Sequence, residues 1–141
     1  MAKSECSMYG ASWVLDGPDV AWVFTLEIRQ GSRFSLICGV DIYALREDQR
    51  PKNANQCLIV FDAEGLPAAV DGYQVRQAFS LDYEMDGQAR EVEVRQLLGA
   101  IVAYARERLT LENIRASFLA GELADGFVHY RARQVLDTRT A

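Results

Sequence analysis

The segment DVAWVFTLEIRQGSRFSLICGVDIY, residues 19–43, decides the fold. Apolar and polar side chains alternate through its first half, and the alternation resumes after Gln30, Gly31 and Ser32. The side chains expected on one face are Val20, Trp22, Phe24, Leu26 and Ile28, then Phe34, Leu36, Cys38, Val40 and Ile42. Two alternating runs joined by a short glycine-containing link predict an antiparallel hairpin.

The segments around this hairpin extend the sheet. ASWVLD (11–16) is a candidate partner strand, and CLIVFD (57–62) reads as a buried strand. Between them, ALREDQRPKNANQ (44–56) is polar and contains Pro51, so we expect an exposed loop. From Tyr73 to Glu84 the alternation returns and predicts a further strand. The sequence therefore predicts an antiparallel sheet of about five strands within the N-terminal 85 residues.

The last third of the chain is predicted to be helical. Apolar residues recur at spacings of three and four between Val94 and Leu109, which predicts a long helix within residues 88–109. Thr110 is a candidate cap for a second helix through residues 111–123, and Asp125 for a third through 126–136. The predicted fold is α+β, one domain over residues 1–141, with C-terminal helices covering one face of the sheet.

Composition narrows the classes of function. The net charge is −5 and the calculated pI is about 4.9, which disfavours nucleic acid and favours a basic protein partner. No apolar run is long enough for a membrane span, and the first 13 residues lack the apolar core of a secretory signal. We therefore expect a cytoplasmic protein. Basic side chains are mostly arginine, which suggests a bacterial origin, and the three dispersed cysteines are expected to be reduced and structural.

One acidic segment, DYEMDGQAREVE (82–93), stands out as a candidate site. Asp82, Glu84, Asp86, Gly87 and Glu93 occupy positions 1, 3, 5, 6 and 12, so the segment resembles the calcium-binding loop of the EF-hand family. Position 3 is Glu84 where that pattern has Asp or Asn, position 8 is Ala89, and position 9 is Arg90. No convincing second loop accompanies it in the sequence, so we predict no metal site here.

The same segment has two structural interpretations. Asp86 and Gly87 form a pair typical of a tight hairpin turn. Alternatively, Asp86 caps the long helix, with Glu91 and Glu93 in its first turn. In either case the carboxylates stay in solvent, and five of them offset only by Arg90 give a local charge of −4 that can steer a basic partner. The candidate partner-binding residues are Asp82, Glu84, Asp86, Glu91, Glu93 and Trp22.

Residues that would support catalysis are scarce. His129 is the sole histidine, and no phosphate-binding glycine motif is found. Asp41 and Asp62 are the carboxylates to inspect for acid–base chemistry, although they can equally end strands. The aromatic residues are expected in the core, with a binding cavity or interface around Trp22 as the alternative. We predict no enzyme and no cofactor.

These observations favour a small, acidic, non-enzymatic protein-binding protein. An immunity protein or antitoxin of bacterial or phage origin, which inhibits a basic partner with carboxylates, is the leading hypothesis. The alternatives are a domain that binds a small molecule or calcium, and an acidic chaperone or adaptor for a secreted protein. A monomer and a homodimer fit the sequence equally well.

Overall fold

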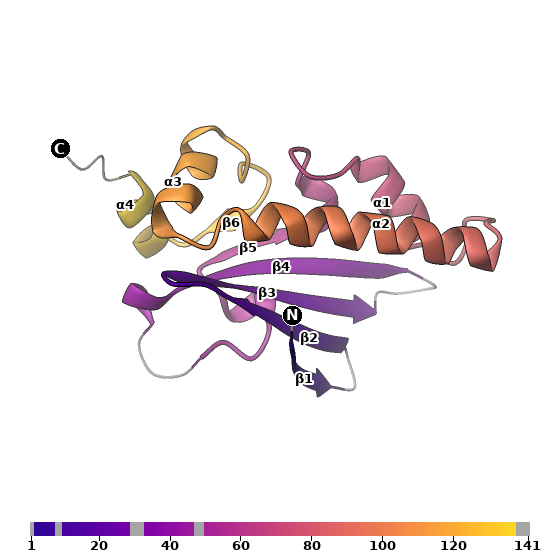
Figure 1. The fold of residues 1–141 in the computed structure, drawn as a ribbon, viewed down its shortest axis with the longest axis horizontal. Coiled ribbons are helices and arrows are strands. Elements are labelled where there is room, and N and C mark those ends of the chain that lie inside the picture. The colour runs from indigo at the N-terminus through magenta and orange to yellow at the C-terminus, as the bar shows by residue number, and fades with distance from the viewer. Residues whose placement is uncertain (1, 8–9, 29–32, 47–49, 138–141) are drawn as a thin grey trace.

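The computed structural model describes residues 2–7, 10–28, 33–46 and 50–137. Its strands follow one another in space in chain order: β1 (Ala2–Ser7), β2 (Gly10–Asp16), β3 (Val20–Ile28), β4 (Phe34–Ile42) and β5 (Ile59–Asp62). All neighbours are antiparallel, and the two-residue β6 (Phe127–Val128) pairs with β5 at the far edge (Figure 1). The predicted sheet is confirmed, with β1 as a strand that the pattern did not indicate. The link at residues 30–32 lies outside the described residues.

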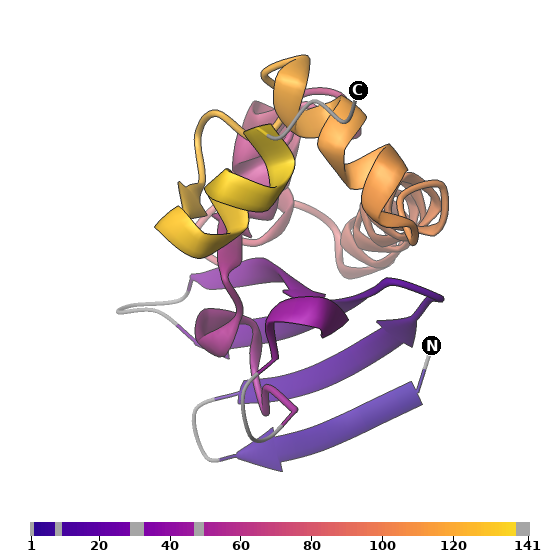
Figure 2. The ribbon, with the colours of Figure 1, turned by 90° about the vertical axis from the view of Figure 1, so that its left-hand side faces the viewer.

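The helices lie together on one face of this sheet (Figure 2). They are α1 (Gly72–Ala78), α2 (Gly87–Arg106), α3 (Leu111–Leu119) and α4 (Tyr130–Asp137). Single 3-10 turns occur at Tyr43–Leu45, Ala54–Gln56 and Ala63–Gly65. Within the part of the chain that the structure describes, no helix has the length and apolarity needed to cross a membrane. The predicted α+β class is confirmed.

The face of the sheet under the helices forms the larger core. Trp22 of β3 lies opposite Val40 of β4, and Phe24 lies opposite Cys38, so alternate residues of both strands point toward the helices. Trp22 is fully buried, with Phe61 and Tyr104 packed edge-on against its ring. Its indole Nε1–H donates to the carbonyl of Arg108, 2.9 Å away. The pattern in residues 19–43 thus identified the inner face correctly.

Part of the opposite face of the sheet is covered by residues 53–57, a segment that precedes β5. Ala54 is fully buried, and its amide donates to Thr25 Oγ1 at 2.8 Å, which also shares a hydrogen bond with Ser12. Gly39 permits this close approach, because a Cβ there would lie 2.6 Å from the Ala54 carbonyl oxygen. The segment 44–56 was predicted to be an exposed loop, so its buried Ala54 corrects that prediction in part.

The strand predicted from Tyr73 to Glu84 is wrong. Residues Gly72–Ala78 form α1, and the Asp71 side chain caps it by accepting from the Tyr73 amide at 2.9 Å. Val75, Ala78 and Phe79 are buried, whereas Tyr73 is 63 % exposed. The buried residues are spaced by three and four, so the helical period rather than the alternation decides which side chains face the core.

The predictions for the later helices are largely confirmed. α2 spans most of the expected range, and the Thr110 hydroxyl caps α3 by accepting from the Asn113 amide at 3.2 Å. The third helix starts later than expected. Asp125 does not cap it, because Phe127 and Val128 pair with β5 before α4 begins at Tyr130.

Candidate functional site

The acidic segment contains a helix start. Asp86 is the N-cap of α2, and its carboxylate accepts hydrogen bonds from the amides of Gln88 and Ala89 at 3.1 and 3.3 Å. The hairpin interpretation is therefore wrong, and the capping interpretation is confirmed. Glu91 and Glu93 lie beyond the first turn of the helix, contrary to expectation.

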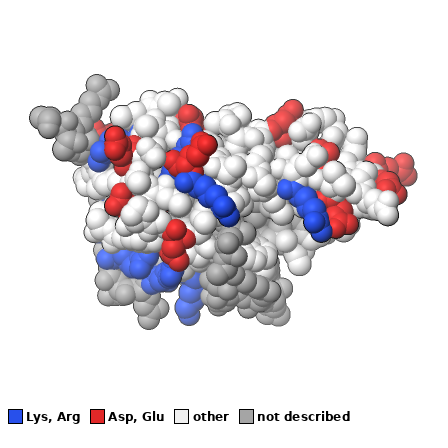
Figure 3. All heavy atoms as spheres, in the orientation of Figure 1, with Lys and Arg blue, Asp and Glu red and all other residues white. Residues whose placement is uncertain are grey.

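The five carboxylates are divided between the loop and the helix. Asp82, Glu84 and Asp86 are exposed on the loop that joins α1 to α2. Glu91 is exposed on α2 and forms an ion pair of 2.9 Å with Arg95, while Glu93 is partly buried. Acidic side chains gather at the right-hand tip of the molecule in Figure 3. The three exposed loop carboxylates are here called the acidic surface.

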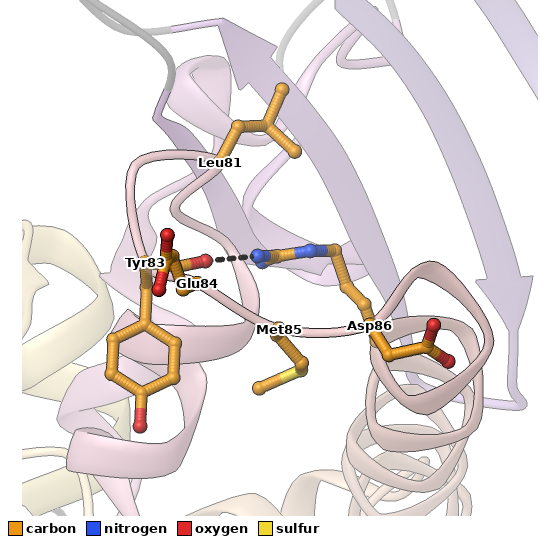
Figure 4. Close-up of a pocket in the computed structure, with 6 residues that line it drawn as sticks. Leu81, Tyr83, Glu84, Met85 and Asp86 are labelled. Carbon is orange, nitrogen blue, oxygen red and sulfur yellow. Dashed lines mark hydrogen bonds between the residues drawn. The ribbon is translucent and has the colours of Figure 1, made fainter.

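The arrangement differs from that of a calcium-binding loop. Residues from Gly87 onward are helical, so the helix carries Glu91 and Glu93, whereas Asp82 and Glu84 stay on the loop. The Asp86 carboxylate turns toward the first turn of α2 (Figure 4). Among the described residues, no group of three or more His, Cys, Asp or Glu side chains is placed to hold a metal ion.

Arg90 connects the loop to its surroundings. Its Nη1 donates to the carbonyls of Gln77, Ala78 and Ser80 at 3.2, 2.7 and 2.8 Å. Its Nη2 donates to the carbonyl of Tyr83 at 2.6 Å, the bond marked by the dashed line in Figure 4. The cation expected to offset the acidic surface is thus directed at backbone oxygens. The surrounding loop forms an open depression of about 630 Å³.

An apolar groove lies between α2 and the sheet, next to this loop. Its volume is about 250 Å³, and it continues toward a second void of about 100 Å³ that shares three of its lining residues. The residues lining the groove are Trp13, Leu26, Phe34, Leu36, Ala78, Phe79, Arg90, Val94 and Leu98. Leu98 keeps 37 % of its surface exposed at the groove. Unfilled apolar space beside solvent is a candidate binding feature.

The position of Trp22 corrects one sequence prediction. Trp22 is fully buried under the helices, so it cannot contact a partner, and the expectation that it belongs to the core holds instead. Trp13 of β2, which lies opposite Phe24, lines the groove and is partly exposed. Sequence reasoning assigned Trp13 to the core. Trp13 and Trp22 differ in the place of their strands within the sheet. β2 lies nearer the edge than β3, and the helices cover it less completely.

The other candidate residues serve the fold. Asp62 lies opposite Ile37, four residues along β4 from Asp41, so the backbone positions of the two residues are about 13 Å apart along the strands. Asp41 is buried and pairs with Arg46, while Asp62 caps the following 3-10 turn. His129 packs against Tyr130, and its Nδ1 accepts from the Arg131 amide at 3.2 Å.

The two described cysteine side chains are buried thiols. Burial is the main cause that raises the pKa of Cys38 above its ordinary value, and it raises the pKa of Cys57 to about 12. A thiol with a raised pKa is a poor nucleophile at neutral pH. Both are free, as expected. Cys38 lies on β4 under the helices, and Cys57 lies in the covering segment on the opposite face of the sheet.

Comparisons with protein-family models, with curated proteins and with solved structures find no match for this chain. The groove and the loop beside it are therefore the features that bear on function.

Proposed function

We propose that this is a non-enzymatic protein-binding protein that takes up an apolar segment of a basic partner in the groove between α2 and the sheet. The observation that carries the proposal is the apolar groove with an acidic loop at one end. The groove supplies an apolar contact, and the loop supplies charge complementarity.

The size of the groove favours side chains of a polypeptide. Pockets for drug-sized molecules usually enclose about 300 to 1,000 Å³. The groove measures about 250 Å³, and it is open along one side. Apolar side chains that project from a partner's backbone fit such a space, while the backbone itself stays outside. Burial of apolar area is the usual source of affinity in such contacts.

The charge favours a basic partner. Asp82 and Glu84 are exposed on the loop, and the chain has a net charge of −5. A basic partner is attracted before contact, which raises its association rate. An inhibitor of the immunity or antitoxin type, which covers a basic surface of a toxin, is our preferred form of this function. An acidic chaperone or adaptor for a secreted protein would use the same surface.

A second candidate function is the binding of a small apolar molecule. The observation that favours it is the inner void of about 100 Å³, which extends the groove toward Phe24 and Ile101. A small apolar molecule that reached this void would need no basic group. Charge dependence of binding therefore separates the two candidates.

The test uses synthetic peptides. A peptide with a run of leucines followed by lysines should bind more tightly than one with leucines followed by glutamates, or one with lysines alone. Replacing Leu98 with aspartate should abolish binding, because a charge would then line the groove. Equal binding of the lysine and glutamate peptides would refute the role of charge and leave the small-molecule candidate.

The acidic loop has its own matched control. Asp82→Asn with Glu84→Gln removes two charges beside the groove, and Glu112→Gln with Asp125→Asn removes two exposed charges elsewhere. The first pair should slow association of the leucine–lysine peptide about tenfold at low salt. The difference should shrink above about 0.15 M salt, where the Debye length is about 8 Å. Equal rates for both pairs would show that the loop does not steer the partner.

A further inference from the structure

The four hydrogen bonds from Arg90 meet at the end of a short helix. α1 has seven residues, and Arg90 binds the carbonyls of its last two, Gln77 and Ala78. Carbonyls at a helix C-terminus lack partners within the helix and attract a cation. One guanidinium thus caps α1, and its other nitrogen reaches the loop carbonyl of Tyr83. The side chain fixes the helix end and the loop relative to each other.

Arg90 also lies where the two parts of the proposed surface meet. It lines the apolar groove together with Phe79 and Val94, and it lines the open depression beside Glu84 and Asp86. The loop has another anchor at its start, where the Phe34 amide donates to the Phe79 carbonyl at 2.8 Å. From Ser80 to Tyr83, however, the Arg90 bonds are the links that tie the loop to α2.

We propose that Arg90 is a positioning residue that holds the acidic loop as a fixed wall at the end of the apolar groove. If the proposed function holds, the fixed loop lets the protein recognise apolar and charged parts of a partner together. That consequence, unlike the position of the loop, rests on the proposed function. Without the guanidinium, the groove remains but the carboxylates are no longer held beside it. Charge-assisted bonds in a fork geometry are needed, because a single ammonium group cannot span these carbonyls.

The first measurement needs no partner. Arg90→Lys keeps the positive charge but removes the two guanidinium nitrogens that donate to the carbonyls. Hydrogen exchange at the amides of Ser80 and Tyr83 should therefore quicken about tenfold or more. Both amides donate to carbonyls of this segment, at 3.3 Å each, so they report its order. Amides of β3 and β4 serve as the internal reference for global stability. Unchanged exchange at Ser80 and Tyr83 would overturn the proposal.

The second measurement tests the coupling. Because Arg90 also lines the groove, uptake of the neutral probe N-phenyl-1-naphthylamine by Arg90→Lys measures any change in the groove itself, and the loss of peptide binding is compared with it. Binding of the leucine–lysine peptide should weaken about fivefold or more in Arg90→Lys. Adding Asp82→Asn and Glu84→Gln to this variant should then weaken peptide binding little further. Undiminished peptide binding, or a loop contribution that survives Arg90→Lys, would overturn the coupling.

Failure of the proposed function gives a different pattern. If wild-type protein takes up neither the neutral probe nor the peptide, the groove is not a binding site. The proposed coupling between apolar and charged recognition is then refuted as well. Faster exchange in Arg90→Lys would then still support the fixed wall as a feature of the fold. A matched variant, Arg95→Lys, changes an exposed arginine of the same helix and should alter none of these measurements.

Discussion

Replacing Val102 with isoleucine should stabilise the protein by about 0.8 kcal/mol, the value of one newly buried methylene group. Val102 is a partly buried residue of α2 that lines the inner void of about 100 Å³. Both residues are β-branched, so their helix propensities are similar. The added methylene group fills space that is already empty, so neighbouring side chains need not move. For a chain of this length, the melting temperature should rise by about 3 °C.

Urea and thermal unfolding followed by circular dichroism measure this change. Val75→Ile is the matched control, because Val75 is a helical valine that is 2 % exposed and does not line the void. Overpacking there should destabilise the protein by about 1 to 3 kcal/mol. Val102→Ile should also reduce uptake of N-phenyl-1-naphthylamine. A loss of 1 kcal/mol or more in Val102→Ile would refute the reasoning, because it would mean that the void is filled in solution.

Two further predictions concern the helix start and a buried phenol. Asp86→Ala should destabilise the protein by about 1 kcal/mol in urea unfolding, because two amides of α2 lose their acceptor, whereas Asp86→Asn should retain most of the stability. Burial, and then the hydrogen bond to Glu122, raises the pKa of Tyr104 to about 12. The folded state therefore holds this proton more tightly than the unfolded state, so its stabilising contribution is complete below about pH 10 and is lost as the pH rises toward 12. Tyr104→Phe should remove that part of the pH dependence, and an unchanged profile between pH 10 and 12 would contradict the assignment.

The sheet could be predicted because large apolar side chains of β3 and β4 point to the inner face, while smaller or polar ones alternate with them on the outer face. Alternation in β3 and β4 is long and regular, and each residue of the pattern has a partner in the adjacent strand. For the region after Val70, the sequence pattern did not decide between a strand and a helix. There, Tyr73, Val75 and Phe79 satisfy alternation, while Val75, Ala78 and Phe79 satisfy a helical period. The cap at Asp71 favours the helix, and local sequence signals of that kind outweigh a short alternating run.

The candidate site was only half predictable. The carboxylates of the loop are visible in the sequence because they are close together. The groove depends on how far α2 lies from β2, which no local pattern encodes. Trp13, Phe34 and Leu98 come from three distant parts of the chain, and each also fits a core position. Arg90 gave a weak signal as an isolated cation in an acidic segment, but its four acceptors follow from the course of the backbone.

The order of elements along the chain has a consequence for synthesis. Strands β2 to β4 lie within the first 42 residues and pair with sequence neighbours, so these hairpins can form as soon as they are made. The helix that covers Trp22 and Phe24 begins only at Gly87. A nascent chain of intermediate length therefore presents an uncovered apolar sheet, the kind of species that aggregates before folding is complete.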